Sequence, residues 1–339
     1  MNLIIPMAGW GTRLRPHTLT VPKPLIKVAG KTVVQRLVET IGRQLDTSFR
    51  NIVFVIKPEF GAGVENRLLA LARELGAAGQ IRYQPEALGT AHAIAMARDF
   101  LDGPVFVAYA DTLFDGSLHL DPSADSVIVV KRVERPEQFG VVQLDEAGHI
   151  VRFVEKPKQF VSDLAIVGIY YFRRGEQLRD EIDRLINEDI RRNGEYQLTD
   201  ALESLLRKGL VFVPATIERW MDFGNYRAAL DTNWAVLDIE SRQGTELVHP
   251  EAVLENVRIH QPVYIGPGVH IRNSEIGPNV SIHAGSRVAD SRISDALIGE
   301  QNHISGSRFS HSMIGNHTRI VDLTQPVSLG DYSEISGKE

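Results

Sequence analysis

A glycine-rich turn near the start of the sequence contains the residue types that bind phosphate. An apolar run at 3–5 leads into Ala8-Gly9-Trp10-Gly11-Thr12-Arg13, and Lys23 follows between two prolines. Glycine lets backbone N–H groups approach phosphate oxygens closely. Arg13 can form paired hydrogen bonds to a pyrophosphate, and Lys23 can add a point charge. The turn lacks the full glycine pattern of a dinucleotide fold and the Gly-Lys-Ser/Thr ending of a P-loop. It therefore indicates a phosphate site of another kind.

The first 38 residues are a basic stretch in an acidic chain. They contain six Lys or Arg residues and no Asp or Glu, whereas the 339 residues together carry a formal net charge of −6. A local positive field in an acidic protein favours a small anionic ligand. Nucleic acid is not an expected partner, because its binding requires a more extended basic surface. A solvated basic surface is the alternative interpretation.

The composition excludes several classes of site and predicts a cytoplasmic protein. There is no cysteine, which excludes disulfides, zinc–thiolate sites, iron–sulfur clusters and thiol nucleophiles. Apolar residues make up 43% and charged residues 24%, as in globular proteins. No apolar run approaches the roughly 18 residues that span a bilayer, so we expect no membrane partner. The N-terminus lacks the basic leader and long apolar run of a signal peptide.

The elements that must position the glycine-rich turn alternate between strands and helices. Apolar runs predict strands at 3–5, 52–56, 81–83, 105–108, 126–133 and 164–172, and a hairpin of 141–144 with 150–154. Apolar residues at intervals of three and four predict helices at 32–45, 65–75, 90–100, 177–188, 198–206 and 225–239, the last closing the domain. This alternation predicts an α/β domain over residues 1–240, with a Rossmann-like, mixed but mostly parallel sheet covered by helices on both faces.

The pattern changes in a second predicted domain, residues 250–335. Apolar side chains recur there every five to six residues, at Ile265, Ile271, Ile276, Ile282, Val288, Ile293, Ile298, Ile304, Phe309, Ile314 and Ile320. This period predicts a parallel β-helix of the hexapeptide type, which is left-handed, with three flat sides and stacked aliphatic residues inside. At roughly 16–18 residues per coil, the periodic segment makes about three and a half to four coils.

Further motifs follow the turn in order along the first domain. They are Gln84-Pro-Glu-Ala-Leu-Gly89-Thr90-Ala91, Tyr109-Ala110-Asp111, Phe139-Gly140-Val141-Val142, Val154-Glu155-Lys156-Pro157, Glu195-Tyr-Gln-Leu-Thr199-Asp200 and Trp220-Met221-Asp222-Phe223-Gly224. With the turn and Pro22-Lys23-Pro24, they resemble the motifs of the sugar-1-phosphate nucleotidylyltransferases, or nucleotide-sugar pyrophosphorylases. The resemblance covers about residues 1–235 and is strongest to thymidylyl- and uridylyltransferases that use glucose 1-phosphate. A hexapeptide β-helix often accompanies this domain.

The resemblance implies roles for individual residues. The nucleotide-binding residues would be Ala8, Gly9, Gly11, Thr12, Gln84, Gly89 and Thr90. The sugar-binding residues would be Gly140, Glu155, Gly168 and Thr199. The catalytic cations would be Arg13, Lys23 and Lys156, and the metal ligands Asp111 and Asp222. Gly89, Thr90 and Thr199 also stand where helices are predicted to begin, so they could equally serve as helix N-termini.

The implied reaction joins a nucleoside triphosphate and a sugar 1-phosphate. An oxygen of the sugar 1-phosphate attacks the α-phosphorus, and pyrophosphate leaves. Because both reactants are anions, fixed cations and a divalent metal must neutralise their charge. Asp111 follows an apolar strand, where open α/β sheets bind ligands. Two carboxylates together with phosphate oxygens suit Mg²⁺. We expect a homo-oligomer that associates through the β-helix.

The substrates and two other functions stay open at this level. The Gln84 segment favours UTP or dTTP, although adenylyl- and guanylyltransferases share its Leu-Gly-Thr-Ala. Glucose 1-phosphate is the expected sugar. The tail holds six of the chain's 11 histidines, and one of them could serve as the general base of an acetyltransferase in a bifunctional enzyme. A catalytically silent regulatory subunit is the third possibility, although such relatives typically lack the Asp, Arg or Lys residues present here.

Overall fold

The computed structural model describes residues 1–45 and 48–337, which form two compact units. Unit 1 consists of Met1–Gly9 and Leu37–Trp220. Unit 2 consists of Trp10–Arg36 and the chain from Met221 onward. We call Trp10–Arg36 the basic segment. The predicted domains 1–240 and 250–335 are continuous in sequence and stay a prediction, whereas unit 2 combines the basic segment with the C-terminal part of the chain.

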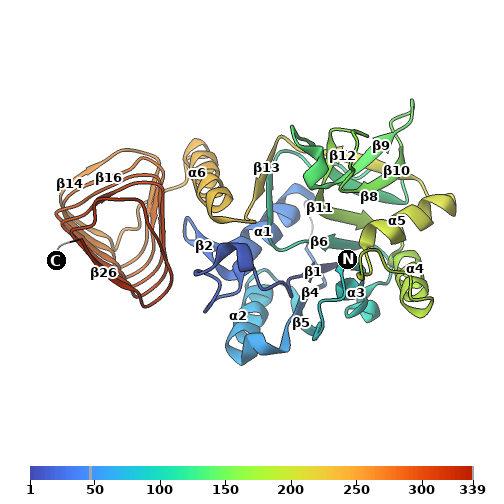
Figure 1. Cartoon of the computed structure of the whole chain (residues 1–339), viewed down its shortest axis with the longest axis horizontal. Helices are drawn as coiled ribbons and strands as arrows, with labels where there is room; N and C mark the ends of the chain where they lie inside the picture. The colour runs from blue at the N-terminus through green and yellow to red at the C-terminus, as the bar shows by residue number, and fades with distance from the viewer. Residues whose placement is uncertain (46–47, 338–339) are drawn as a thin grey trace. The chain divides into compact units, whose positions relative to one another are not determined.

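A nine-stranded mixed sheet forms the centre of unit 1 (Figure 1). Its parallel part contains β6 (Val105–Ala108), β1 (Asn2–Pro6), β4 (Asn51–Ile56) and β5 (Ala78–Tyr83), in that order. The first three are apolar runs whose middle residues are fully buried, as expected for parallel strands covered on both faces. The predicted mixed, mostly parallel α/β fold is therefore confirmed.

Five further strands complete the nine-stranded sheet on the side of β6. It comprises β8 (Ser126–Arg132), β9 (Gly140–Leu144), β10 (Ile150–Glu155), β11 (Leu164–Phe172) and β12 (Phe212–Thr216). β11 runs antiparallel to β6, β8 and β9, and β10 forms the predicted hairpin with β9. Short β7 (Thr112–Asp115) and β13 (Arg219–Asp222) lie outside this sheet.

The helices of the first part of the chain follow the predicted order. They are α1 (Val33–Leu45), α2 (Gly61–Glu74), α3 (Thr90–Ala95), α4 (Gly175–Asn187) and α5 (Leu198–Arg207). The predicted helix 90–100 is too long. Its last turn tightens, so that the N–H of Ala97 donates to the oxygen of Ile94, and a separate 3₁₀ turn follows at Arg98–Phe100.

A parallel β-helix makes up most of unit 2. On its first face β14 (Val253–Ile259), β16 (His270–Ile276), β18 (Arg287–Ala289), β21 (His303–Ser305), β24 (Arg319–Val321) and β26 (Glu334–Ser336) stack in order. The second face adds β19 (Arg292–Ile293) and β22 (Arg308–Phe309). The third contains β15 (Val263–Ile265), β17 (Val280–Ile282), β20 (Ala296–Ile298), β23 (Ser312–Ile314) and β25 (Ser328–Leu329).

The periodic aliphatic residues of the sequence fill the interior of this β-helix. All eleven predicted positions, from Ile265 to Ile320, are buried in one apolar cluster. The stack continues on both sides of the periodic segment, from β14 to β26, so it is longer than the pattern alone indicates. The coils are visible end-on in Figure 1.

α6 (Tyr226–Arg242) packs against the third face of the β-helix within unit 2. The Asn233 amide donates to the oxygen of Asn279 at 3.1 Å and accepts from the Ser281 hydroxyl at 2.6 Å. The helix predicted at 225–239 is present. The hydrogen bonds of its Asn233 side chain are made with the β-helix. Among the described residues, no helix is long and apolar enough to cross a membrane.

Candidate active site

The ends of the parallel strands bring several predicted site residues of unit 1 to one edge of the sheet. Ala8 and Gly9 follow β1, Gln84 follows β5, and Asp111 follows β6. β1 pairs in parallel with β4 and β6, and β4 with β5, so the carboxyl ends of these strands share that edge. Ligands of open α/β sheets bind beyond this edge. Ala8 is buried and Gly9 is exposed, so the chain emerges from the sheet at Gly9.

Gln84 is buried at the end of β5 with its amide group held in place. Its Nε2 donates to the oxygen of Gly89 at 3.1 Å and lies 3.1 Å from Nδ1 of His92. Burial lowers the pKa of His92, which favours the neutral ring that can accept this bond. With both amide hydrogens engaged, the carboxamide oxygen of Gln84 is the atom left to accept from a ligand N–H.

Gly89 and Thr90 join the predicted nucleobase segment to the predicted sugar segment. The N–H of Ala91 donates to the oxygen of Tyr196 at 2.9 Å, and the N–H of Leu198 donates to the Thr90 hydroxyl at 2.9 Å. Gly89 has φ +109°, and a Cβ there would lie 2.4 Å from the oxygen of Tyr196. Only glycine permits this conformation and approach. Gly89 also precedes the first residue of α3, so both expected roles of the position are compatible.

Three predicted sugar-binding residues lie together on the antiparallel side of the sheet. Gly140 opens β9 and stands opposite Glu155, the last residue of β10. A Cβ on Gly140 would lie 3.1 Å from a carboxylate oxygen of Glu155 and 3.7 Å from the methyl of Thr199. Burial raises the pKa of Glu155, partly offset by Lys156 and Arg192. Glycine at 140 therefore lets the Glu155 carboxylate and Thr199 lie close to the β9 backbone.

Gly168 connects this cluster to the strand that precedes Asp111. Its oxygen accepts from the N–H of Tyr109 at 2.9 Å, two residues before Asp111. Its φ is +97°, and a Cβ there would lie 2.7 Å from the ring of Tyr109. Glycine at 168 is therefore required where β11 passes the Tyr109 ring. Its role in binding sugar stays a prediction.

Lys156 has an unusual backbone for a residue that is not glycine. Its φ is +42°, while its N–H donates to the oxygen of Phe139 at 3.0 Å. Left-handed backbone at such residues is strained and is often retained at functional sites. The side chain is exposed directly after the Gly140–Glu155 pair. The turn therefore presents a cation beside the sugar-binding cluster.

The remaining residues of the glycine-rich turn lie in unit 2. Gly11 has φ +61° and precedes the 3₁₀ turn Thr12–Leu14, and Lys23 opens a second 3₁₀ turn. The Thr18 hydroxyl donates to the oxygen of Gly11 at 2.8 Å. Thr12 and Arg13 are exposed, which leaves the hydroxyl and the guanidinium accessible to a ligand.

Asp222 is the last residue of β13 and lies in unit 2. The position of its carboxylate explains why residue 224 of the same motif is glycine. A Cβ on Gly224 would lie 2.7 Å from the Asp222 carboxylate, so glycine leaves the space that this carboxylate occupies. The Thr232 hydroxyl of α6 donates to the backbone oxygen of Asp222 at 2.9 Å. The motif thus fixes the position of a carboxylate by glycine and by the following helix.

Within the predicted motifs, two polar side-chain atoms lack hydrogen-bond partners among the described residues; one belongs to Thr199, a predicted sugar-binding residue, and the other to Trp220, to which the sequence assigned no role. The Thr199 hydroxyl and the indole nitrogen of Trp220 are buried without a hydrogen-bond partner. Trp220 packs against Phe139, with ring centroids 4.9 Å apart. Buried polar groups are normally satisfied, so these atoms are candidates for ligand contacts. The sequence showed both residues inside motifs, but burial could only come from the structure.

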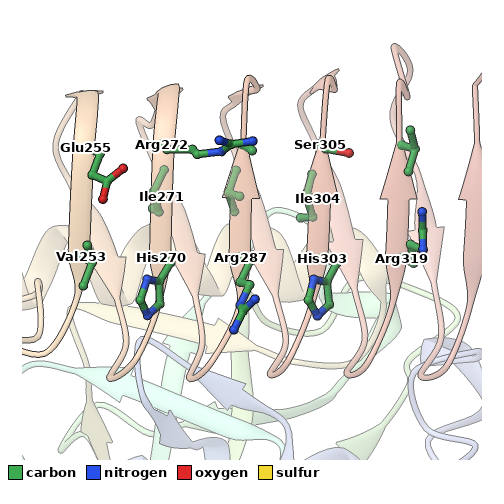
Figure 2. A pocket seen from close by; sticks show the side chains of 13 residues that line it. Val253, Glu255, His270, Ile271, Arg272, Arg287, His303, Ile304, Ser305 and Arg319 are labelled. Carbon is green, nitrogen blue, oxygen red and sulfur yellow. The ribbon is translucent and has the colours of Figure 1, made fainter.

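The histidines of the tail differ in their surroundings. Figure 2 shows His270, Arg287, His303 and Arg319 in a row on successive strands of the first face, beside a hollow of about 690 Å³. Among the described residues, neither His270 nor His303 has a hydrogen-bond partner that would orient its ring as a general base. Of the other tail histidines, His260 pairs with Glu275 at 2.8 Å and His283 is buried.

Comparison with known proteins shows the family of the chain. Residues 3–239 match the family described as nucleotidyl transferase. The chain belongs to this family. Residues 256–290 of this nucleotidyl transferase also match the bacterial transferase hexapeptide repeat.

Relatives of the nucleotidyl transferase extend over both parts of the chain. A glucose-1-phosphate thymidylyltransferase of Streptomyces antibioticus is 31% identical over 99% of each chain. A mannose-1-phosphate guanylyltransferase catalytic subunit beta of Drosophila melanogaster is 29% identical over 78% of this chain and 71% of the relative. A Bacillus anthracis protein, crystallised with sucrose and named provisionally as a glucose-1-phosphate thymidylyltransferase, has a TM-score of 0.58 and 24% identity. It covers 69% of this chain and 94% of its own, and supports the fold.

Proposed function

We propose that this nucleotidyl transferase moves a nucleotidyl group from a nucleoside triphosphate to a sugar 1-phosphate, and that dTTP or UTP and glucose 1-phosphate are its preferred substrates. The observation that carries the proposal is the cluster of Gly140, Glu155 and Thr199, joined through the Tyr196 backbone to Gly89 and the Gln84 amide. Backbone and side-chain contacts thereby connect the residues proposed to bind the sugar with those proposed to bind the base. A cytoplasmic location and oligomerisation through the β-helix stay predictions.

In this reaction an oxygen of the sugar 1-phosphate forms a bond to the α-phosphorus. The bond from that phosphorus to the bridging oxygen breaks, and pyrophosphate leaves with the electron pair. Lys156 would hold the attacking phosphate, while Glu155 would accept from sugar hydroxyls. Arg13 and Lys23 would neutralise the charge that develops on pyrophosphate, because fixed cations need no reorganisation in the transition state. Gly9, Gly11 and Thr12 would offer backbone N–H groups to the phosphates, and Ala8 would precede them at the strand end.

The donor set at the two acidic positions suits Mg²⁺. Asp111 lies three residues after the end of β6, and Gly224 leaves space beside the Asp222 carboxylate. Both residues offer hard oxygen ligands, which Mg²⁺ prefers. Asp111 and Asp222 would hold the ion, with phosphate oxygens among its further ligands. The bound ion would supply positive charge to the triphosphate and the attacking phosphate.

The Gln84 amide and the relatives favour a base that carries a ring N–H. The carboxamide oxygen of Gln84 is placed to accept, and thymine, uracil and guanine each present a ring N–H on their pairing edge. Two thymidylyltransferases are 30% and 31% identical over 98% and 99% of this chain, and a rice relative named as a mannose-1-phosphate guanylyltransferase is 30% identical over 99%. We put dTTP and UTP before GTP because the motif around Gln84 most resembles that of thymidylyl- and uridylyltransferases.

The test is pyrophosphate release with Mg²⁺, crossing dTTP, UTP, GTP, ATP and CTP against several sugar 1-phosphates. We expect turnover with dTTP or UTP and glucose 1-phosphate, and kcat reduced about 100-fold or more in Asp111→Asn and Lys156→Ala. Lys158→Ala and Asp115→Asn are matched controls, since they change the same residue types two and four positions further along the chain. Near-wild-type turnover in Asp111→Asn and Lys156→Ala would refute the assigned roles. Silence across the whole grid from a folded protein would favour the regulatory subunit.

A further inference from the structure

Polar contacts fasten the basic segment to the β-helix within unit 2. His17 Nε2 lies 2.9 Å from the hydroxyl of Ser328. The Thr20 hydroxyl donates to Asp331 at 2.7 Å. Lys27 Nζ donates to Glu300 at 2.6 Å. Each of these pairs joins residues more than 270 positions apart, so the sequence alone gives no sign of them.

A tight hairpin extends the same attachment toward α1. β2 (Lys27–Val28) and β3 (Lys31–Thr32) flank Gly30, whose φ is +85°. The N–H of Gly30 donates to His283 Nε2 at 3.3 Å, and a Cβ at Gly30 would lie 2.6 Å from the Tyr264 hydroxyl. His283 Nδ1 lies 2.7 Å from the oxygen of Ile298 and must donate to it, so Nε2 is the accepting nitrogen.

Arg36 braces the hairpin from the other side. Its guanidinium donates to the oxygens of Val28 and Ala29, and it pairs with Glu240 of α6 at 2.5 Å. Arg36 is largely buried, and charge-assisted bonds in such positions are among the stronger polar contacts. The end of the basic segment is therefore held by α6 as well as by the β-helix.

The anchored side of the basic segment differs from the side that carries the predicted phosphate ligands. Leu14, His17 and Thr18 are buried, whereas Thr12 and Arg13 are exposed. Internal bonds connect the two sides, because Gly11 accepts both from the Thr18 hydroxyl and from the N–H of Leu14. Fixing His17 and Thr18 therefore also fixes the backbone at Gly11.

We propose that the β-helix is a positioning element for nucleotide binding, and that Ser328, Glu300 and Asp331 hold the glycine-rich turn in the conformation that accepts the triphosphate. This inference rests on the proposed function. An unanchored glycine-rich turn would sample many conformations, and the apparent affinity for its ligand would fall with the fraction that is competent. The Tyr264–His283 surface supports the same segment at Gly30. These residues act through the turn and need not touch substrate.

The test removes two anchors from the β-helix side in the full-length protein. We expect Ser328→Ala/Glu300→Ala to raise KM for the nucleoside triphosphate about tenfold, since two net hydrogen bonds are lost. KM for the sugar 1-phosphate should change less than about twofold, because Glu155, Thr199 and Lys156 are untouched. If these anchors contributed only to stability, their removal would lower the fraction of active protein. It would not raise KM for the nucleotide more than KM for the sugar 1-phosphate. Adding His17→Ala to Ser328→Ala should have little further effect on KM, since both substitutions remove the same hydrogen bond.

Ser305→Ala/Glu334→Ala is the matched control, as it changes the same residue types on the first face of the β-helix. Backbone hydrogen exchange over residues 11–27 should be faster in Ser328→Ala/Glu300→Ala than in this control. Unchanged exchange there would overturn the anchoring, even if the wild type turned over no substrate. Faster exchange with an unchanged KM for the nucleotide, or an equal rise in both KM values, would overturn the positioning role. Absence of wild-type turnover would instead refute the proposed function.

Discussion

Thr199 carries a buried hydroxyl for which the described residues offer no hydrogen-bond partner. The residue is 7% exposed, and its methyl group would lie 3.7 Å from a Cβ at Gly140. An unsatisfied buried hydroxyl costs about 1–3 kcal/mol, so its retention is best explained by a bond that forms only with a ligand. If the hydroxyl binds a ligand, removing it should weaken binding without lowering the stability. If it stabilises the helix, removing it should lower the stability.

The corresponding change is Thr199→Val, which keeps the shape of the side chain and removes the hydroxyl. We expect the free energy of unfolding to stay the same or to rise by up to about 1 kcal/mol, since no native bond is lost. KM for the sugar 1-phosphate should rise about five- to tenfold. Urea denaturation and steady-state kinetics measure the two effects, and Thr199→Ser is the control. A destabilised Thr199→Val with an unchanged KM would assign the hydroxyl to the helix.

Gly89 shows how one backbone position can tie two binding segments together. A Cβ there would lie 2.4 Å from the backbone oxygen of Tyr196, and φ is +109°. Gly89→Ala should therefore push the Gln84 segment away from Tyr196 and cost about 2 kcal/mol or more in unfolding free energy. Loss of turnover should exceed the loss of folded protein. Gly148→Ala, in an open surface turn with φ +86°, is the control for backbone strain alone. Equal effects of the two substitutions would contradict the role assigned to Gly89.

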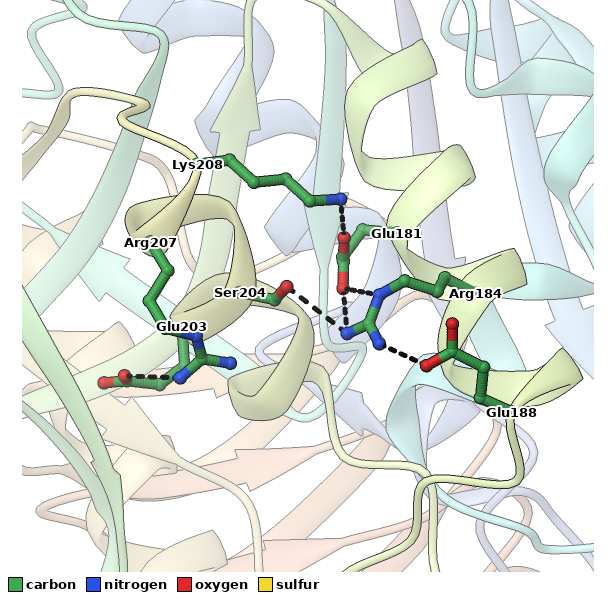
Figure 3. A network of polar contacts seen from close by, with 7 residues as sticks. All are labelled: Glu181, Arg184, Glu188, Glu203, Ser204, Arg207 and Lys208. Atoms are coloured by element: carbon green, nitrogen blue, oxygen red, sulfur yellow. Dashed lines mark hydrogen bonds and ion pairs between the residues drawn. The ribbon is translucent and has the colours of Figure 1, made fainter.

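At the scale of elements, the buried carboxylate of Glu181 connects α4 with α5, the helix that carries Thr199. Glu181 of α4 has no exposed surface, and Figure 3 shows it between Arg184 and Lys208. Arg184 Nε donates to it at 2.8 Å, Lys208 of the α5 C-terminus donates to its other oxygen, and Arg184 reaches Ser204 of α5 at 3.3 Å. Burial raises the pKa of Glu181, but these donors outweigh it and the net shift is downward.

Removing both cations should leave this carboxylate buried and unpaired. We expect Arg184→Ala/Lys208→Ala to lower the free energy of unfolding by about 3 kcal/mol or more. Adding Glu181→Leu should restore most of that loss, because an apolar side chain of similar volume needs no partner. Urea denaturation of the three proteins measures both steps. If Glu181→Leu deepened the loss, the network would be stabilising in a way that burial of charge does not explain.

Much of the architecture could be predicted because its causes are local. The strands β6 and β11 begin and end where their apolar runs do, and the β-helix interior follows a short repeat. The start of α2 at Gly61 was missed because glycine has low helix propensity, and the packing of the whole helix outweighs it. The predicted site residues, Thr199 among them, came from motifs, but the unpartnered Thr199 hydroxyl and Trp220 indole nitrogen became visible only through burial.

At the scale of the molecule, the basic segment shows what a sequence pattern cannot contain. Residues 1–38 stood out by charge, and their motif indicated a phosphate site. Nothing in the sequence connects His17 to Ser328 or Gly30 to His283, because these contacts arise only when the chain returns after 311 and 253 residues. The contacts inside unit 2 therefore connect the tail to the basic segment in a way that the repeat pattern does not show.

These contacts include two buried histidines that make unit 2 sensitive to acid. Burial lowers the pKa of His17 and of His283 from 6.5 to about 4. Asp331 acts in the opposite direction on His17. Around His283, Lys27 and Arg36 favour the neutral ring, while Glu300 and the bond to Ile298 oppose it. The folded state therefore binds fewer protons than the unfolded state between pH 4 and 6.5. Stability from both rings is present above pH 6.5 and is lost as the pH falls toward 4.

Each histidine should cost about 2 kcal/mol of unfolding free energy between pH 7 and pH 5. Urea titrations at the two pH values measure the total, to which other groups also contribute. His17→Gln/His283→Asn removes both titrating rings while keeping amide donors, so the pH 7 to pH 5 difference should shrink by about 4 kcal/mol. A difference of the same size in this variant and in the wild type would show that neither ring is held neutral by its burial. In that case Gly30 would need another acceptor, since protonated His283 could only donate.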